Sequence, residues 1–272
     1  MNEQKNLIKE DLFSRIGVTK HLIHLDVLNK DIEIRPYAHG DTKTLLAILS
    51  KYQNQKNPKG FEKDIVYAQK NLVENCILGD ITGEKINILD LPVADYIKTV
   101  IELKRFTTGE TTPLRFKCVN EDCEDETKQR YIKDFVFDVD DCHLNSEQKD
   151  KKTIEIEMGG QNVKFHMREY SFGILFNNIE FFSGNLKDQD KINSFYVDFI
   201  DSIEFPDKSF DNLPKEMKIE FMNKMTPKQT KEIMEYANLR PKYIWEKEWE
   251  CPICGAKNIS ALREVSDFFF LL

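Results

Sequence analysis

The chain has 272 residues, of which 40% are hydrophobic and 32% are charged, so it can form one large domain or two smaller ones and is not a disordered chain. Its formal net charge of −8 argues against nonspecific DNA binding, which needs Lys and Arg side chains to displace counterions from phosphates. No apolar stretch reaches the roughly 20 residues that are needed to span a membrane.

The first part of the chain predicts an arm followed by a mainly helical region. Residues 1–29 have apolar residues at the spacing of a short helix but nothing that closes a core, so we expect an N-terminal arm. Residues 30–112 begin with a strand that stops at Pro36. Helices are then expected to start at Asp41, which has the side chain of a helix N-cap, and at Phe61 and Leu91-Pro92.

Residues 113–168 predict a β-rich region. Strand-like runs over 114–117 and 131–139 flank a turn that contains Cys118 and Cys123. A second hairpin follows, and it has a Gly-Gly pair in its turn. Its two strands are expected over 153–158 and 163–167.

The last part of the chain predicts helices and then a return to strands. Residues 169–238 carry apolar side chains mainly at helical spacing, so we expect a helical insertion there. Residues 239–272 contain a strand over 243–250 that runs into Cys251 and Cys254. We expect this segment to form one β-rich region with residues 113–168. The predicted fold class is α+β, with helical layers and short β-hairpins.

The two cysteine pairs predict one structural zinc ion per chain, bound by four thiolates. Cys118 and Cys123 have C-x4-C spacing, whereas Cys251 and Cys254 have C-x2-C spacing in a turn with Pro and Gly. Four Cys ligands leave no open position for water, so this pattern favours a structural rather than a catalytic metal. Because the pairs lie far apart in the sequence, they predict a split zinc-ribbon-like substructure with four cysteine ligands. Two unrelated half-motifs, or a disulfide, are the alternatives.

Other candidate ligands and catalytic groups give weaker signals. Cys142 and His143 follow an acidic run and offer an alternative ligand pair if a thiol of the first pair does not bind. Cys76 lies on the apolar face of a predicted helix and is expected in the core. The sequence contains no phosphate-binding loop, HExxH or GxSxG motif, so we predict that the protein is not an enzyme.

Two aromatic features are candidates for packing or for partner binding. Trp245 and Trp249 are four residues apart in a predicted strand, so both face the same side, which is either core or a partner surface. The chain also ends in five consecutive apolar residues, which either pack on their own domain or dock on another protein. These candidate docking residues are Phe268, Phe269, Phe270, Leu271 and Leu272.

Several segments together are similar to a known family. Their order along the chain resembles that of the T-even-type phage baseplate proteins, which are the hub and hub-assembly proteins of contractile-tailed phages. The segments are Ile32-Glu-Ile-Arg-Pro-Tyr37 before a helix with Leu45-Leu46, Asp95 through Arg105 and Gly109 before Cys118 and Cys123, and Cys251-Pro-Ile-Cys-Gly255 before Asp267-Phe268-Phe269.

The resemblance implies a non-enzymatic protein that builds, or helps to assemble, the central hub of a tail baseplate. Its partners would be other baseplate or hub proteins in a hetero-oligomeric assembly, with no nucleic acid and no membrane. Its location would be the virion tail, or the host cytoplasm during assembly, where reduced thiols are expected. The alternatives are a transcription-associated zinc-ribbon regulator that binds RNA polymerase and a zinc-dependent enzyme, which needs an open coordination position.

Overall fold

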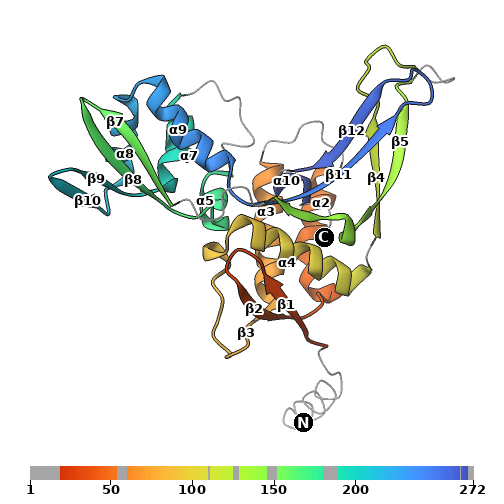
Figure 1. The fold of residues 1–272 in the computed structure, drawn as a ribbon. Coiled ribbons are helices and arrows are strands. Elements are labelled where there is room, and N and C mark those ends of the chain that lie inside the picture. Colours follow the sequence, from red (N-terminus) through yellow and green to blue (C-terminus); the bar gives the residue numbers. More distant parts are fainter. Residues whose placement is uncertain are drawn as a thin grey trace, which may run out of the picture.

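The protein has an α+β fold in which three groups of elements meet (Figure 1). The computed structural model describes residues 19–53, 60–109, 111–124, 129–145, 152–179, 189–263 and 265–268. A central group contains helices α2 to α4 and strands β1 to β3. Two β-rich lobes extend from it, one with β7 to β10 and one with β4, β5, β11 and β12 (Figure 1). Within the described ranges, no helix is long and apolar enough to cross a membrane.

Helix α4 (Val93–Thr108) lies at the centre of the molecule. It begins after Pro92 and ends at Gly109, whose φ of 101° is unfavourable for a residue with a side chain. Most of its side chains are buried, because it contacts elements from both ends of the chain. These elements include α3 (Phe61–Cys76), β1 (His21–Leu25), α5 (Phe172–Asn177), β11 (Lys242–Glu250) and α10 (Val265–Phe268). As predicted, Cys76 is a buried core residue.

The N-terminal region differs from the expected arm. Strands β1 and β2 (Lys30–Ile34) form an antiparallel hairpin, and β2 also pairs with β3 (Ile77–Asp80). Ile23 and Leu25 are buried against α4, so residues 21–25 close the core rather than project from it. Residues 1–18 lie outside the described part of the chain.

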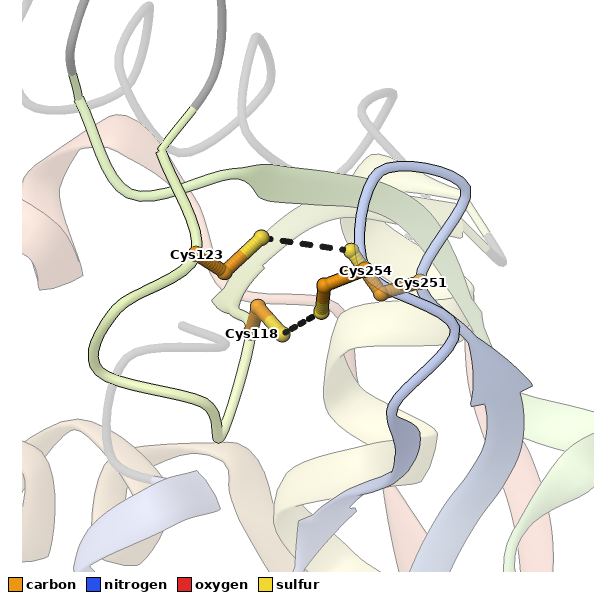
Figure 2. A group of neighbouring side chains, drawn as sticks. All are labelled: Cys118, Cys123, Cys251 and Cys254. Carbon is orange, nitrogen blue, oxygen red and sulfur yellow. Dashed lines mark hydrogen bonds between the residues drawn. The ribbon is translucent and has the colours of Figure 1, made fainter.

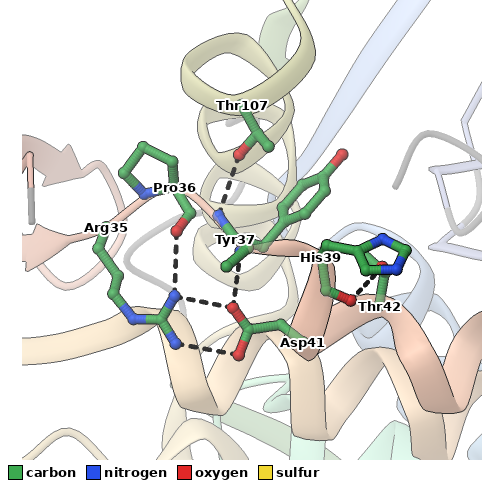
Figure 3. A network of polar contacts seen from close by, with 8 residues as sticks. Arg35, Pro36, Tyr37, His39, Asp41, Thr42 and Thr107 are labelled. Carbon is green, nitrogen blue, oxygen red and sulfur yellow. Dashed lines mark hydrogen bonds and ion pairs between the residues drawn. The ribbon is translucent and has the colours of Figure 1, made fainter. Parts of the chain in front are cut away.

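Helix α2 (His39–Tyr52) starts before Asp41, which is therefore not its N-cap. Instead, the Asp41 carboxylate accepts hydrogen bonds from both terminal nitrogens of Arg35, at 2.8 and 3.0 Å, and from the backbone N–H of Ala38, at 2.7 Å (Figure 3). The Arg35 guanidinium holds the pKa of Asp41 below its usual range. The neighbouring N–H of Tyr37 donates to the Thr107 hydroxyl at 3.1 Å and so joins this segment to α4 (Figure 3).

A four-stranded antiparallel sheet forms the second lobe, in the order β10-β9-β8-β7. The predicted hairpin supplies β7 (Thr153–Met158) and β8 (Gln161–Met167), which pair in register on either side of the Gly-Gly turn. The other two strands are β9 (Ile200–Phe205) and β10 (Lys208–Asp211). One face of the sheet is buried under helices α7 (Gln189–Tyr196), α8 (Lys215–Asn223) and α9 (Pro227–Asn238). A capping box of Thr226 and Gln229 starts α9, with Pro227 as its first residue.

This lobe corrects the expectation that residues 169–238 are wholly helical. The segment contains β9 and β10, and β9 pairs with β8. The hairpin at 153–167 therefore belongs to the same sheet as residues 200–211 and not to the cysteine-containing strands. The apolar residues keep helical spacing from Ile192 through Phe199, Ile200 and Ile203, so the sequence predicts a helix across the start of β9.

The third lobe holds both cysteine pairs. The hairpin of β4 (Thr111–Lys117) and β5 (Ile132–Asp138) packs against the sheet β12-β11-β6, which contains β12 (Lys257–Leu262) and β6 (His143–Asn145). Trp245 lies between the two layers, with its ring centroid about 6 Å from those of Phe116, Phe135 and Phe137. It is fully buried, whereas Trp249 on the same face is half-buried, so this face of β11 is mainly core. Three short 3-10 segments, at Ile88–Asp90, Val139–Asp141 and Val197–Phe199, complete the described elements.

Helix α10 places Phe268 in the central core. Phe268 has an exposed fraction of 1% and belongs to the same hydrophobic cluster as α4. It therefore packs on its own fold and is not a surface docking residue. The other four candidates, Phe269 to Leu272, lie outside the described residues.

Candidate metal centre

The tips of two β-hairpins bring the four predicted cysteines together. Cys118 and Cys123 lie in the turn between β4 and β5, and Cys251 and Cys254 lie in the turn between β11 and β12 (Figure 2). The Sγ atoms of Cys118 and Cys254 are 3.7 Å apart, and those of Cys123 and Cys251 are 3.6 Å apart. All four Sγ atoms lie within 4.8 Å of one another. The pairs are therefore not two unrelated half-motifs.

This arrangement fits a tetrahedral metal ion. Four thiolates at the usual Zn–S bond length of about 2.3 Å place their sulfurs about 3.8 Å apart, close to the two short separations. All four cysteines are free, so the disulfide alternative does not hold. A set of four thiolates favours soft or borderline cations such as Zn²⁺ over Mg²⁺ or Ca²⁺. Within the described residues, this is the one group of His, Cys, Asp and Glu side chains arranged to hold a metal.

Backbone hydrogen bonds fix the first turn, in which the Asn120 carbonyl accepts from the Cys123 N–H at 3.2 Å. The Cys118 N–H donates to the Tyr131 carbonyl at 2.9 Å, which closes the base of the turn. The Arg130 guanidinium donates to the carbonyls of Cys118 and Val119. The wide C-x4-C spacing therefore still produces a defined loop, because its carbonyls have partners.

The second turn has the tight backbone conformation that its glycine predicts. Gly255 adopts a φ of 68°, in the left-handed region that favours glycine, and its N–H donates to the Cys251 carbonyl at 2.9 Å. The Cys251 N–H donates to the Ala256 carbonyl at 2.9 Å. This turn directs both sulfurs to the same side, toward the first pair (Figure 2).

Asn258 links the two turns, a role that the sequence did not indicate. Its side-chain oxygen accepts a hydrogen bond from the Val119 N–H at 2.7 Å, and its side-chain nitrogen donates to the Ala256 carbonyl at 2.7 Å. Asn258 is 3% exposed, and both of its hydrogen bonds are partly buried. An isolated Asn in a strand gives no signal of such a role, because the partner lies 139 residues away.

Burial and hydrogen bonding set the ionisation of the thiols. Burial raises the pKa of Cys118 and raises the pKa of Cys123 to about 12. The pKa of Cys254 is lowered to about 7, mainly by a backbone hydrogen bond from Ala256. Three of the thiols are buried, and that of Cys254 is exposed. A divalent cation binds the thiolate form, so binding releases protons and weakens in acid.

Cys142 and His143 are not part of this centre. Cys142 is half-buried against the central hydrophobic cluster, where burial raises the pKa of its thiol to about 12. His143 is exposed at the start of β6. The structure therefore contradicts the alternative ligand pair. Cys142 follows an acidic run in the sequence, but it packs against the central hydrophobic cluster and is not part of the group of four thiols.

Asp95, one of the residues on which the family resemblance rests, joins the N-terminal hairpin to α4. The Asp95 carboxylate accepts hydrogen bonds from the backbone N–H groups of Val27 and Leu28, at 3.0 and 2.8 Å. Asp95 has an exposed fraction of 0%, and burial raises the pKa of its carboxyl. In the same turn, Asp26 accepts a hydrogen bond from the Tyr243 hydroxyl of β11. Asp95 therefore has a structural role, at the point where the hairpin, α4 and the cysteine lobe meet.

Comparison with known proteins identifies a family. A family model described as "T4 bacteriophage base plate protein" matches residues 18–270, which is most of the chain. No curated protein and no solved structure matches the chain.

Proposed function

Because the chain belongs to the T4 bacteriophage base plate protein family, and is therefore a structural protein of a phage baseplate, we propose that it builds or helps to assemble the central hub. The matched residues extend from the N-terminal hairpin to α10 and include all three groups of elements. Membership supports a location in the virion tail and interaction with other phage structural proteins. The sequence segments that resemble the hub and hub-assembly proteins favour the central hub as its position in the baseplate.

The protein acts, in this proposal, by docking on other baseplate proteins and not by catalysis. The four-thiolate centre supports this function because it leaves no coordination position for a substrate. Its chemistry is that of a staple, which holds two hairpin tips from distant parts of the sequence in one geometry. We propose that the bound ion is Zn²⁺, with one ion per chain held by Cys118, Cys123, Cys251 and Cys254.

The family match does not favour a transcription-associated regulator that binds RNA polymerase. A zinc-dependent enzyme is also disfavoured, since it needs one of the four ligand positions to be open. The observation that carries the proposal is therefore the family match along most of the chain. The cluster of four thiols supports the part of the proposal in which a metal ion holds the two hairpin tips together.

A phage that lacks a functional copy of this gene tests the proposed function. We expect infected cells to accumulate tail components without complete baseplates, as judged by electron microscopy, and purified protein added to the extract to restore infectious particles. Mass spectrometry of purified particles then distinguishes a permanent hub component from a transient assembly factor. Normal baseplates in the absence of the protein would contradict the proposal.

A further inference from the structure

We propose that the tip of the cysteine lobe is a docking surface for a protein with an apolar pocket bordered by Lys and Arg side chains. We define this tip surface as residues 119–124 and 252–256, the two turns that carry the thiols. The inference rests on the proposed function and names the surface and the kind of partner through which the protein joins the baseplate.

Apolar side chains are exposed at the tip even though the turns around them are tightly held. Val119 has an exposed fraction of 56% and directly follows Cys118, and Ile253 has an exposed fraction of 50% and directly precedes Cys254. The thiols of these two cysteines are 3.7 Å apart, so the two aliphatic residues flank the same sulfur pair. Pro252 is also exposed beside them. Each of the two hairpins thus carries an exposed aliphatic residue next to one thiol of the same pair.

Hydrogen bonds within and between the two turns define the shape of the tip. The backbone bonds within each turn and the Asn258 link hold the two turns in register, and a bound ion would hold the sulfurs as well. A surface that is already ordered loses little conformational entropy on binding, which favours affinity. Exposed aliphatic side chains on such a rigid support are suited to enter a pocket.

The negative charge of the tip indicates which side chains border the partner's pocket. Glu121, Asp122 and Glu124 are exposed, and the two turns contain no Lys or Arg. Glu250 adds a fourth carboxylate, which lies beside Gly255. Four thiolates around a divalent ion leave two further negative charges uncompensated. Lys117 and Lys257 lie at the adjoining strand ends, and the Arg130 guanidinium contacts the Val119 carbonyl, so three cations border a tip that has four carboxylates and the thiolate centre. The partner surface is therefore complementary if it is basic around an apolar centre.

The test uses the full-length protein and extracts of cells infected with phage that lacks the gene. The variant V119S/I253S removes the apolar groups without touching a metal ligand, so we expect it to keep the metal content and melting temperature of the wild type. We expect it to restore about tenfold fewer infectious particles than the wild type, because a central apolar contact often contributes at least that factor. Ile259→Ser is the matched control. Ile259 is 56% exposed on β12, outside the tip, and its variant should restore infectivity as the wild type does.

Charge reversal tests the basic rim independently. E121K/D122K should reduce both infectivity and the amount of baseplate proteins that the tagged chain captures from the same extract. Capture by the wild type should also decrease as salt is raised, since salt screens exposed charges. E155K/E157K is the control, because both glutamates are exposed on β7 in the other lobe. An unchanged or stronger activity of E121K/D122K would overturn the assignment of a basic partner.

The outcomes separate this inference from the proposed function. If the wild type fails to restore infectivity, the baseplate role itself is contradicted. If the wild type restores it and V119S/I253S is equally active, the hub function stands and the tip surface is wrong. A loss that Ile259→Ser shares would also overturn the tip, because the effect would then not be local to it.

Discussion

The side-chain oxygen of Asn258 accepts a hydrogen bond from the backbone N–H of Val119 at 2.7 Å, across 139 residues of sequence. This bond joins the two turns that carry the thiols without involving a sulfur. It shows that the contact between the hairpin tips has a protein component as well as the expected metal component.

Replacement of Asn258 by Ala should weaken that contact. The Val119 N–H would lose its acceptor in a partly buried site, so we expect the free energy of unfolding to fall by about 0.5–1.5 kcal/mol. Chemical denaturation of the metal-loaded protein measures the change. Asn162→Ala is the control, because Asn162 is exposed on β8 and its loss should change stability by less than about 0.5 kcal/mol. Equal effects of the two variants would show that the link contributes nothing specific.

Each of the four cysteines in the centre should be needed for metal binding. We expect elemental analysis of the purified wild type to give one zinc ion per chain and each single Cys→Ser variant at Cys118, Cys123, Cys251 or Cys254 to lose it. Structural zinc contributes about 10–16 kcal/mol in isolated peptides, so loss of the ion should unfold the cysteine lobe. Near-ultraviolet circular dichroism from Trp245 reports this change.

Cys142→Ser is the matched control for the four ligand variants. Cys142 is free but lies outside the cluster, so its variant should retain one equivalent of zinc even if its stability falls. Zinc that survives the loss of Cys118 or Cys123 would contradict the four-ligand centre.

The buried carboxyl of Asp95 should give the protein a pH-dependent stability. Burial raises its pKa in the folded state, so as pH rises from the usual Asp value of about 3.9 the unfolded chain releases this proton first. The folded state then binds more protons, and the free energy of unfolding declines with rising pH up to the folded-state pKa. Asp95→Asn lacks this contribution, and the neighbouring Asp26 is common to both proteins. The stability difference, wild type minus variant, should therefore fall with pH in this window, and a constant difference from urea titrations would contradict it.

Gly173 should not tolerate a side chain. A Cβ atom there would lie 2.7 Å from the carbonyl oxygen of Leu89, which is backbone and cannot move freely. We expect Gly173→Ala to reduce the free energy of unfolding by about 1–3 kcal/mol through overpacking. Gly40→Ala is the opposite case, because nothing lies within 4 Å of its Cβ position in α2, and it should stabilise the helix by up to about 1 kcal/mol. Thermal melts of the two variants should shift in opposite directions.

The sequence predicted the elements whose signals are local. Helices α3 and α4 follow from apolar residues at helical spacing, and the hairpin of β7 and β8 follows from alternation around a Gly-Gly turn. It did not predict β1, because the short run His21–Leu25 has apolar residues at three of five positions and no clear alternation. Strand β9 was also missed, and its partner β8 is separated from it by α5 and α7.

Within the candidate centre, the sequence by itself determined the four thiols and the turn chemistry at Gly255, since both depend on neighbouring residues. The identity of the ion remains a prediction. Only the tertiary structure decided that the two pairs meet, that Asn258 links them and that Phe268 is buried in the core. The physical reason is that side-chain period and turn preference are properties of short segments. Strand partners and burial depend instead on contacts across long loops, whose closure entropy is offset only when the whole core packs.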